Sequence, residues 1–94
     1  MKIVQSRKVE DCFDGSSVYA YSFDEAWTRG TIASIQVFGK LDYFPDFPRP
    51  FFRVRGRTGL EVKGVEGETN CRVVFPEREK ETIKRQFEET FPVG

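Results

Sequence analysis

The chain has 94 residues, no histidine, two cysteines and equal numbers of acidic and basic residues, 15 of each. This length suits one domain, and it allows a hydrophobic core without disulfides or metals. The absence of histidine removes serine–histidine and cysteine–histidine catalytic pairs as well as the commonest metal ligand. Because the net charge is zero, electrostatic binding to nucleic acid or to an anionic membrane requires a local patch.

Membrane insertion and secretion are not expected from the sequence. No segment approaches the ~20 apolar residues of a membrane span, and the amino terminus lacks the apolar run of a signal peptide. We therefore expect a cytoplasmic protein that does not bind membranes.

The two cysteines, Cys12 and Cys71, do not indicate a reactive site. They are too few for a structural zinc site, and they are not spaced as a Cys-x-x-Cys redox pair. Cys12 has acidic neighbours, which disfavour its thiolate, and Cys71 alternates with apolar residues of an expected strand. Since no other motif points to a reaction, we expect a protein without catalytic residues, cofactor or metal, although a role for Cys12 stays open.

The first part of the chain predicts a hairpin followed by a helix. Residues 2–9 and 18–21 are expected strands, joined by a polar turn around Asp14 and Gly15. Ser22 and Glu25 have the spacing of a capping box, and an apolar stripe that includes Trp27 follows it. This pattern predicts a helix over residues 23–38 with Trp27 in the core. The alternative ends the helix at Gly30 and makes residues 31–38 a strand.

The second part of the chain predicts an antiparallel meander and a final helix. Expected strands are residues 40–44, 51–55, 60–65 and 71–75, and the turn signals between the last three favour hairpins. The final helix is expected to begin at Pro76 and to stop at Pro92, with Ile83, Phe87 and Phe91 on its apolar stripe. We therefore predict one α+β domain over residues 1–94, a two-layer sandwich in which two helices cover one face of an antiparallel sheet of about five or six strands.

Strand alternation gives the meander two chemically different faces. The residues expected on the apolar face are Phe52, Val54, Leu60, Val62, Cys71, Val73 and Phe75. The residues expected on the polar face are Arg53, Arg55, Glu61, Lys63 and Arg72.

The aromatic and proline connector at residues 44–52 is the first candidate binding site. Its three prolines, Pro45, Pro48 and Pro50, lower the cost of ordering an exposed loop, and aromatic side chains are favoured in protein interfaces. The expected contact residues are Phe44, Phe47, Arg49 and Phe51. This interpretation predicts a noncatalytic accessory domain that binds a protein partner or itself. The structural alternative is that Phe44, Phe47 and Phe52 cap the core.

The polar face of the meander is the second candidate. Guanidinium and ammonium groups beside an exposed aromatic ring suit phosphate contact and base stacking. The residues for such nucleic-acid or anion binding are Arg53, Arg55, Lys63 and Arg72. The alternative is an ordinary solvated face on which arginine and glutamate pair across strands.

Overall fold

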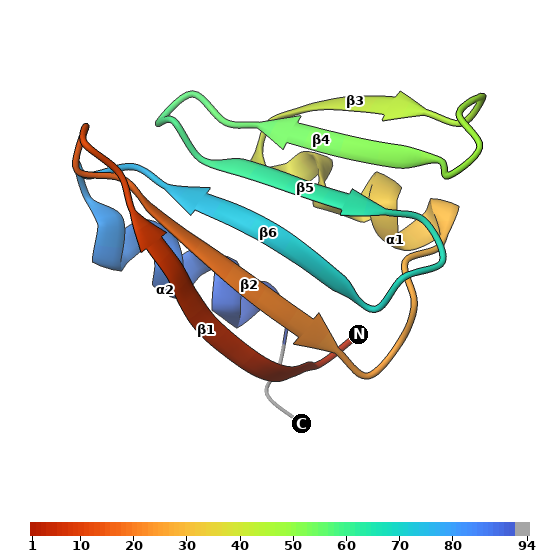
Figure 1. Cartoon of the computed structure of the whole chain (residues 1–94), viewed down its shortest axis with the longest axis horizontal. Helices are drawn as coiled ribbons and strands as arrows, with labels where there is room; N and C mark the ends of the chain where they lie inside the picture. Colours follow the sequence, from red (N-terminus) through yellow and green to blue (C-terminus); the bar gives the residue numbers. More distant parts are fainter. Residues whose placement is uncertain (92–94) are drawn as a thin grey trace.

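The structure is a computed structural model that describes residues 1–91. It contains an antiparallel sheet of six strands and two α-helices, so the predicted α+β class is confirmed. Both helices lie on one side of the sheet, behind it in Figure 1. The elements are β1 (Ile3–Asp11), β2 (Ser17–Phe23), α1 (Arg29–Ser34), the 3₁₀ helix η1 (Ile35–Phe38), β3 (Lys40–Phe44), β4 (Phe51–Arg55), β5 (Glu61–Val65), β6 (Asn70–Phe75) and α2 (Lys80–Thr90).

The strands lie in the order β1-β2-β6-β5-β4-β3, and every neighbouring pair is antiparallel. After β2 the chain leaves the sheet, forms α1 and η1, and re-enters at the far edge with β3. Successive antiparallel pairs then bring β4, β5 and β6 back toward β2. The pairing of β2 with β6 therefore joins the first hairpin to the rest of the sheet.

The inner face of the sheet, which we define as the face toward the helices, carries the core. All seven meander residues that alternation placed on the apolar face are buried. From α2, the ring of Phe87 packs against Tyr21 and Phe75 of the sheet, with centroid distances of 5.0 and 6.0 Å. The alternating pattern thus determines which side of the sheet the helices cover.

Trp27 is buried in this core, as predicted, with 1% of its surface exposed. Its ring meets those of Phe23, Phe52 and Phe91 at centroid distances of 5.3, 4.8 and 6.1 Å. The indole Nε1 donates a hydrogen bond to the backbone carbonyl of Asn70 at 2.9 Å. The core therefore accommodates both the apolar ring and its polar N–H group.

The predicted helix over residues 23–38 is wrong in its first part, and the alternative strand over residues 31–38 is wrong as well. β2 continues to Phe23, and helix α1 begins only at Arg29, where Thr28 and Thr31 form the capping box. Between them, Trp27 N–H donates to the carbonyl of Glu68 and Phe23 N–H to that of Thr69. The bond from Phe23 satisfies a backbone donor that a helix start at Ser22 would have left without an intrahelical partner, and both bonds link this segment to the β5–β6 loop.

The final helix begins at Lys80, four residues later than the expected start at Pro76. Glu79 has φ of 60°, a left-handed conformation that cannot belong to a continuous right-handed helix. The expected apolar stripe is correct, since Ile83, Phe87 and Phe91 are buried. Pro92, the expected helix stop, lies outside the described residues.

Candidate functional site

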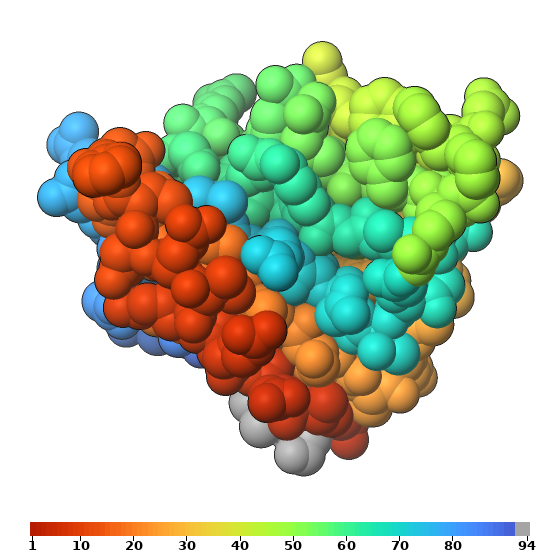
Figure 2. Space-filling view, viewed as in Figure 1, coloured from red at the N-terminus to blue at the C-terminus, as the bar shows by residue number. Residues whose placement is uncertain are grey.

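The outer face of the sheet, opposite the helices, brings together residues of both predicted sites. It is the face toward the viewer in Figure 2, with the β1–β2 hairpin at one margin and the connector 45–50 at the other. Rows of directly opposed residues cross this face from strand to strand. The middle row is Asp42, Arg53, Lys63, Arg72, Ala20 and Arg7, and a flanking row begins with Phe44, Phe51 and Val65.

Phe44, Phe47 and Phe51 form what we call the aromatic cluster, at the connector margin of the outer face. The rings of Phe44 and Phe51 stack at 4.5 Å, and Phe47 meets them at 6.0 and 5.1 Å. Phe47 is 53% exposed, whereas Phe52 is fully buried on the inner face. Of the three phenylalanines considered as core caps, only Phe52 therefore belongs to the buried core.

Arg53, Lys63 and Arg72 form what we call the cation row, on three adjacent strands. Arg53 lies directly opposite Lys63, and Lys63 lies directly opposite Arg72. Like charges in such positions destabilise a sheet. Acidic side chains relieve this repulsion only in part: Asp42 pairs with Arg53 at 3.3 Å, and Glu61 with Lys63 at 3.1 Å.

Arg72 has no ion pair with any residue in the described range 1–91. Asp42, at the other end of the row, is shared by Arg53 and Arg55. Partial burial opposes its ionisation, but the hydrogen bond from Arg53 and the nearby positive charges hold the pKa of Asp42 below its ordinary value. Asp42 thus offsets part of the positive charge at one end of the row, whereas no ion pair within residues 1–91 offsets the charge of Arg72 at the other end.

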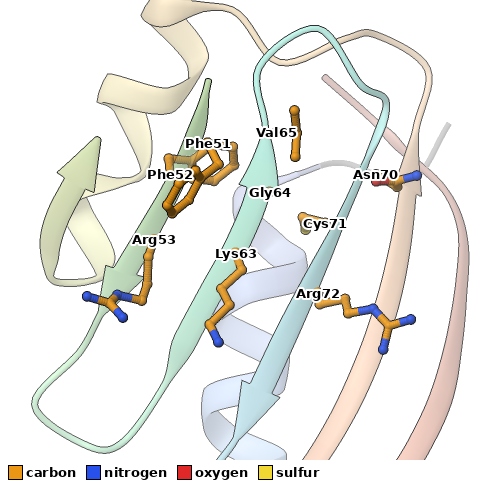
Figure 3. Close-up of a pocket in the computed structure, with 9 residues that line it drawn as sticks. All are labelled: Phe51, Phe52, Arg53, Lys63, Gly64, Val65, Asn70, Cys71 and Arg72. Atoms are coloured by element: carbon orange, nitrogen blue, oxygen red, sulfur yellow. The ribbon is translucent and has the colours of Figure 1, made fainter. Parts of the chain in front are cut away.

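A hollow of about 410 Å³ lies between the aromatic cluster and the cation row. Figure 3 shows Phe51 and Val65 at one end of it, and the side chains of the cation row extending from three strands at the other. Nε of Arg53 is shielded from solvent and has no hydrogen-bond partner among the described residues. The hollow can therefore receive an apolar group from a ligand that also carries negative charge.

Four predicted site residues lie outside this hollow: Phe44 and Phe47, which belong to the aromatic cluster, and Arg49 and Arg55. Arg49, from the connector, forms an ion pair with Glu68 of the β5–β6 loop. Arg55 lines a separate depression of about 630 Å³ at the end of the sheet near η1 and α2, together with Lys40 and Arg57. The structure thus brings Arg53, Lys63 and Arg72 together with Phe51 around the hollow, whereas Arg55 does not line it and is linked to the cation row through Asp42.

Several residues of this surface were not identified from the sequence. Asp42 could have been found from hairpin register, because a short connection places it opposite Arg53. Identifying Arg7 required the strand order, because only the pairing of β2 with β6 places Arg7 in the middle row. Phe13 had a weak local signal, an aromatic residue inside a polar turn.

Phe13 lies at the tip of the β1–β2 hairpin, where its relative exposure of 113% is that of a side chain projecting freely into solvent. Acidic residues flank it. Asp11 accepts a hydrogen bond from Ser17 and Asp14 accepts two from Ser16, and these bonds lower the pKa of both carboxyl groups. The tip therefore presents an aromatic ring surrounded by ionised carboxylates at neutral pH.

The two thiols are expected to differ strongly in reactivity. Cys71 is 4% exposed on the inner face, and burial raises its pKa to about 12. Cys12 is partly exposed in the hairpin tip. In the folded protein at pH 8, a thiol reagent should label Cys12 rapidly, while Cys71 should react only after unfolding, because it is both inaccessible and protonated.

Mass spectrometry of the labelled protein, followed by peptide mapping, measures this difference. The Cys12→Ser variant is the control and should show almost no labelling in native buffer but one label in denaturant. Equal labelling of both thiols in the native protein would contradict the inward orientation of Cys71.

Within residues 1–91, no cluster of three or more His, Cys, Asp or Glu side chains could hold a metal ion. The same residues include no helix that is long and apolar enough to cross a membrane. Comparison of the chain with protein-family models, with curated proteins and with solved structures found no match.

Proposed function

We propose that this chain is a noncatalytic protein-interaction module whose contact surface is the outer face of the sheet, anchored by the aromatic cluster. The observation that carries the proposal is that Phe44, Phe47 and Phe51 pack against one another outside the core, on a face that no described helix covers. Exposed aromatic clusters of this kind are enriched at the centres of protein interfaces. Cytoplasmic residence is part of the same proposal and rests on the sequence alone.

The shape of the connector supports a protein partner. Pro45, Pro48 and Pro50 restrict its backbone, and Glu66 N–H donates to the carbonyl of Pro50 at 2.9 Å. The ion pair between Arg49 and Glu68 adds a second link between the connector and the β5–β6 loop. A preorganised aromatic anchor loses little conformational entropy on binding, so more of its contact energy appears as affinity.

Binding of single-stranded nucleic acid is the second candidate, and the cation row is the observation that favours it. Two features of the same surface weigh against it. The rings of Phe44 and Phe51 stack on each other, which leaves fewer ring faces for bases. In addition, Arg53 and Lys63 already have acidic partners, and a carboxylate near a phosphate weakens the contact. We therefore favour the protein partner.

The Phe47→Ser variant tests the proposal. Because Phe47 is about half exposed, its loss should lower the free energy of unfolding by less than about 1 kcal/mol. Capture of a protein partner by the immobilised chain, or its self-association, should nevertheless weaken about tenfold, as expected for an interface anchor. The matched control is Val37→Ser, which removes another exposed apolar side chain, 75% exposed, on η1.

Thermal melts, sedimentation and pull-downs from lysate provide these measurements, and a gel shift with single-stranded RNA addresses the second candidate. RNA binding that decreases steeply with salt and is abolished by Arg72→Glu would replace the protein proposal with the nucleic-acid one. A large loss of thermal stability in Phe47→Ser without any change in assembly or capture would remove the aromatic cluster as a binding site.

A further inference from the structure

We propose that the partner of the outer face is a second copy of this chain, whose acidic β1–β2 hairpin tip docks with Phe13 in the hollow beside the cation row. This inference rests on the proposed function, because it names the protein that the outer face binds. It assigns a role to Phe13, the most exposed of the large hydrophobic residues among the described part of the chain.

Hydrogen bonds hold the hairpin tip in a conformation that exposes the ring of Phe13. Cys12 N–H donates to the carbonyl of Ser16 at 2.8 Å, and Gly15 N–H donates to that of Cys12 at 3.0 Å. Lys80 of α2 donates to the carbonyl of Gly15 at 2.7 Å and to the hydroxyl of Ser17 at 2.8 Å. The turn is therefore held by the body of the protein, and Phe13 projects from a rigid hairpin.

The hollow has the complementary chemistry. Phe51 and Val65 supply apolar surface for a ring, and a volume of about 410 Å³ exceeds that of a phenylalanine side chain. The cation row borders the same hollow, and Arg72 has no acidic partner among residues 1–91. In the hollow, the ring of Phe13 makes apolar contacts while the carboxylates that flank it lie near the cation row. This combination favours association and fixes the orientation of one copy relative to the other.

The carboxylates of the tip remain charged under the conditions of binding. Hydrogen bonds from Ser17 and Ser16 lower the pKa values of Asp11 and Asp14, and Glu10 is exposed beside them. Lys8 pairs with Asp11 at 3.5 Å, and the ammonium group of Lys80 lies close enough to act on Asp11 and Asp14, so these two cations balance part of this charge. The remaining acidic side chains make the tip negatively charged, whereas the cation row makes the hollow positively charged.

The positions of the two surfaces determine the kind of assembly. The β1–β2 hairpin tip lies at one margin of the molecule in Figure 2, and the hollow faces the viewer over β5 and β6. One copy can therefore donate its tip to a second copy while its own hollow stays open to a third. Such a contact is heterologous, and it produces rings or open chains rather than only closed twofold dimers.

Two variants of the full chain test the two sides of the contact, the tip and the hollow, independently. Phe13→Ser removes the tip anchor, and the double variant Lys63→Glu, Arg72→Glu reverses charge at the hollow. Both change exposed side chains, and thermal melts verify that each variant folds. Sedimentation velocity from micromolar to near-millimolar concentration measures self-association. The wild type should associate more weakly at high salt than at low salt. Each variant should associate about tenfold or more weakly than the wild type.

Mixing the two variants tests directly whether the tip of one copy binds the hollow of another. Phe13→Ser retains an intact hollow, and the double variant retains an intact tip. Each variant alone should associate at least about tenfold more weakly than the wild type, whereas their equimolar mixture should form a heterodimer with one copy of each and nothing larger. Val37→Ser is the control for the loss of an exposed apolar side chain and should assemble like the wild type.

A wild type that is monomeric throughout this range would overturn self-docking. So would a Phe13→Ser variant that assembles normally, or a mixture that forms no heterodimer. If, in any of these cases, Phe47→Ser or the double variant still loses capture of another protein, the interaction function stands and only the identity of the partner is wrong. If neither variant alters protein capture or assembly, both proposals fail.

Discussion

Replacing Trp27 with alanine is expected to lower the free energy of unfolding by about 3–5 kcal/mol. The indole contacts rings from β2, from β4 and from the segment after α2, so its removal leaves a cavity shared by three parts of the fold. The carbonyl of Asn70 also loses its donor from Nε1. A loss of this size is a large fraction of the stability of a domain of this length.

Urea unfolding followed by circular dichroism measures this effect, since the variant lacks the chain's single tryptophan. Trp27→Phe provides the matched control: it retains most of the apolar ring but not the N–H group, and it should cost less than the alanine variant. In the wild type, the fluorescence of native Trp27 should be that of a water-shielded indole. A spectrum typical of an exposed indole, or an alanine variant as stable as the wild type, would contradict the central placement of Trp27.

Replacing Gly39 with alanine is the second large expected effect, a loss of about 3 kcal/mol or more. A Cβ at this position would stand 2.2 Å from the backbone oxygen of Arg55 and 2.7 Å from the Cα atom of Gly56. These are backbone atoms at the end of β4, so relief of the clash requires β3 and β4 to move apart where Lys40 pairs with Arg55. No change of side-chain rotamer can remove it.

Gly30→Ala is the matched control, the same chemical change elsewhere in the chain. The nearest atom to a Cβ there is Oγ1 of Thr28 at 3.8 Å, and Gly30 lies in α1, where alanine is favoured by up to about 1 kcal/mol. The two variants should therefore shift the urea midpoint in opposite directions. A Gly39→Ala variant with the midpoint of the wild type would show that β3 and β4 adjust without cost.

Part of the candidate surface could be predicted from the sequence because it depends on strand alternation. Once residues 51–55 are recognised as a strand, Phe52 and Val54 must lie opposite Phe51 and Arg53. The same argument places Lys63 and Arg72 on the polar side of their strands. Alternation does not say which strands are neighbours, but the turn signals predicted the hairpins that make β4, β5 and β6 adjacent. The structure adds their register, which places Arg53, Lys63 and Arg72 directly opposite one another.

The segment before α1 shows the opposite case, in which a strong local signal failed. Ser22 and Glu25 have capping-box spacing, yet Ser22 belongs to β2 and pairs with Asn70. A capping box stabilises a helix start by about 1 kcal/mol, whereas strand pairing and the burial of Phe23 and Trp27 contribute several times as much. Tertiary packing therefore displaced the helix to Arg29.

The sequence by itself determined the α+β class, most strand positions, the apolar face and the apolar stripe of the final helix. These features follow from periodic patterns and turn residues, which act over a few neighbouring positions. Only the tertiary structure decided the strand order, the separation of the aromatic cluster from the core, and the projection of Phe13 on a hairpin opposite the connector. Each of these depends on contacts between residues far apart in the chain, such as Ala20 with Arg72, and no local pattern specifies such pairings.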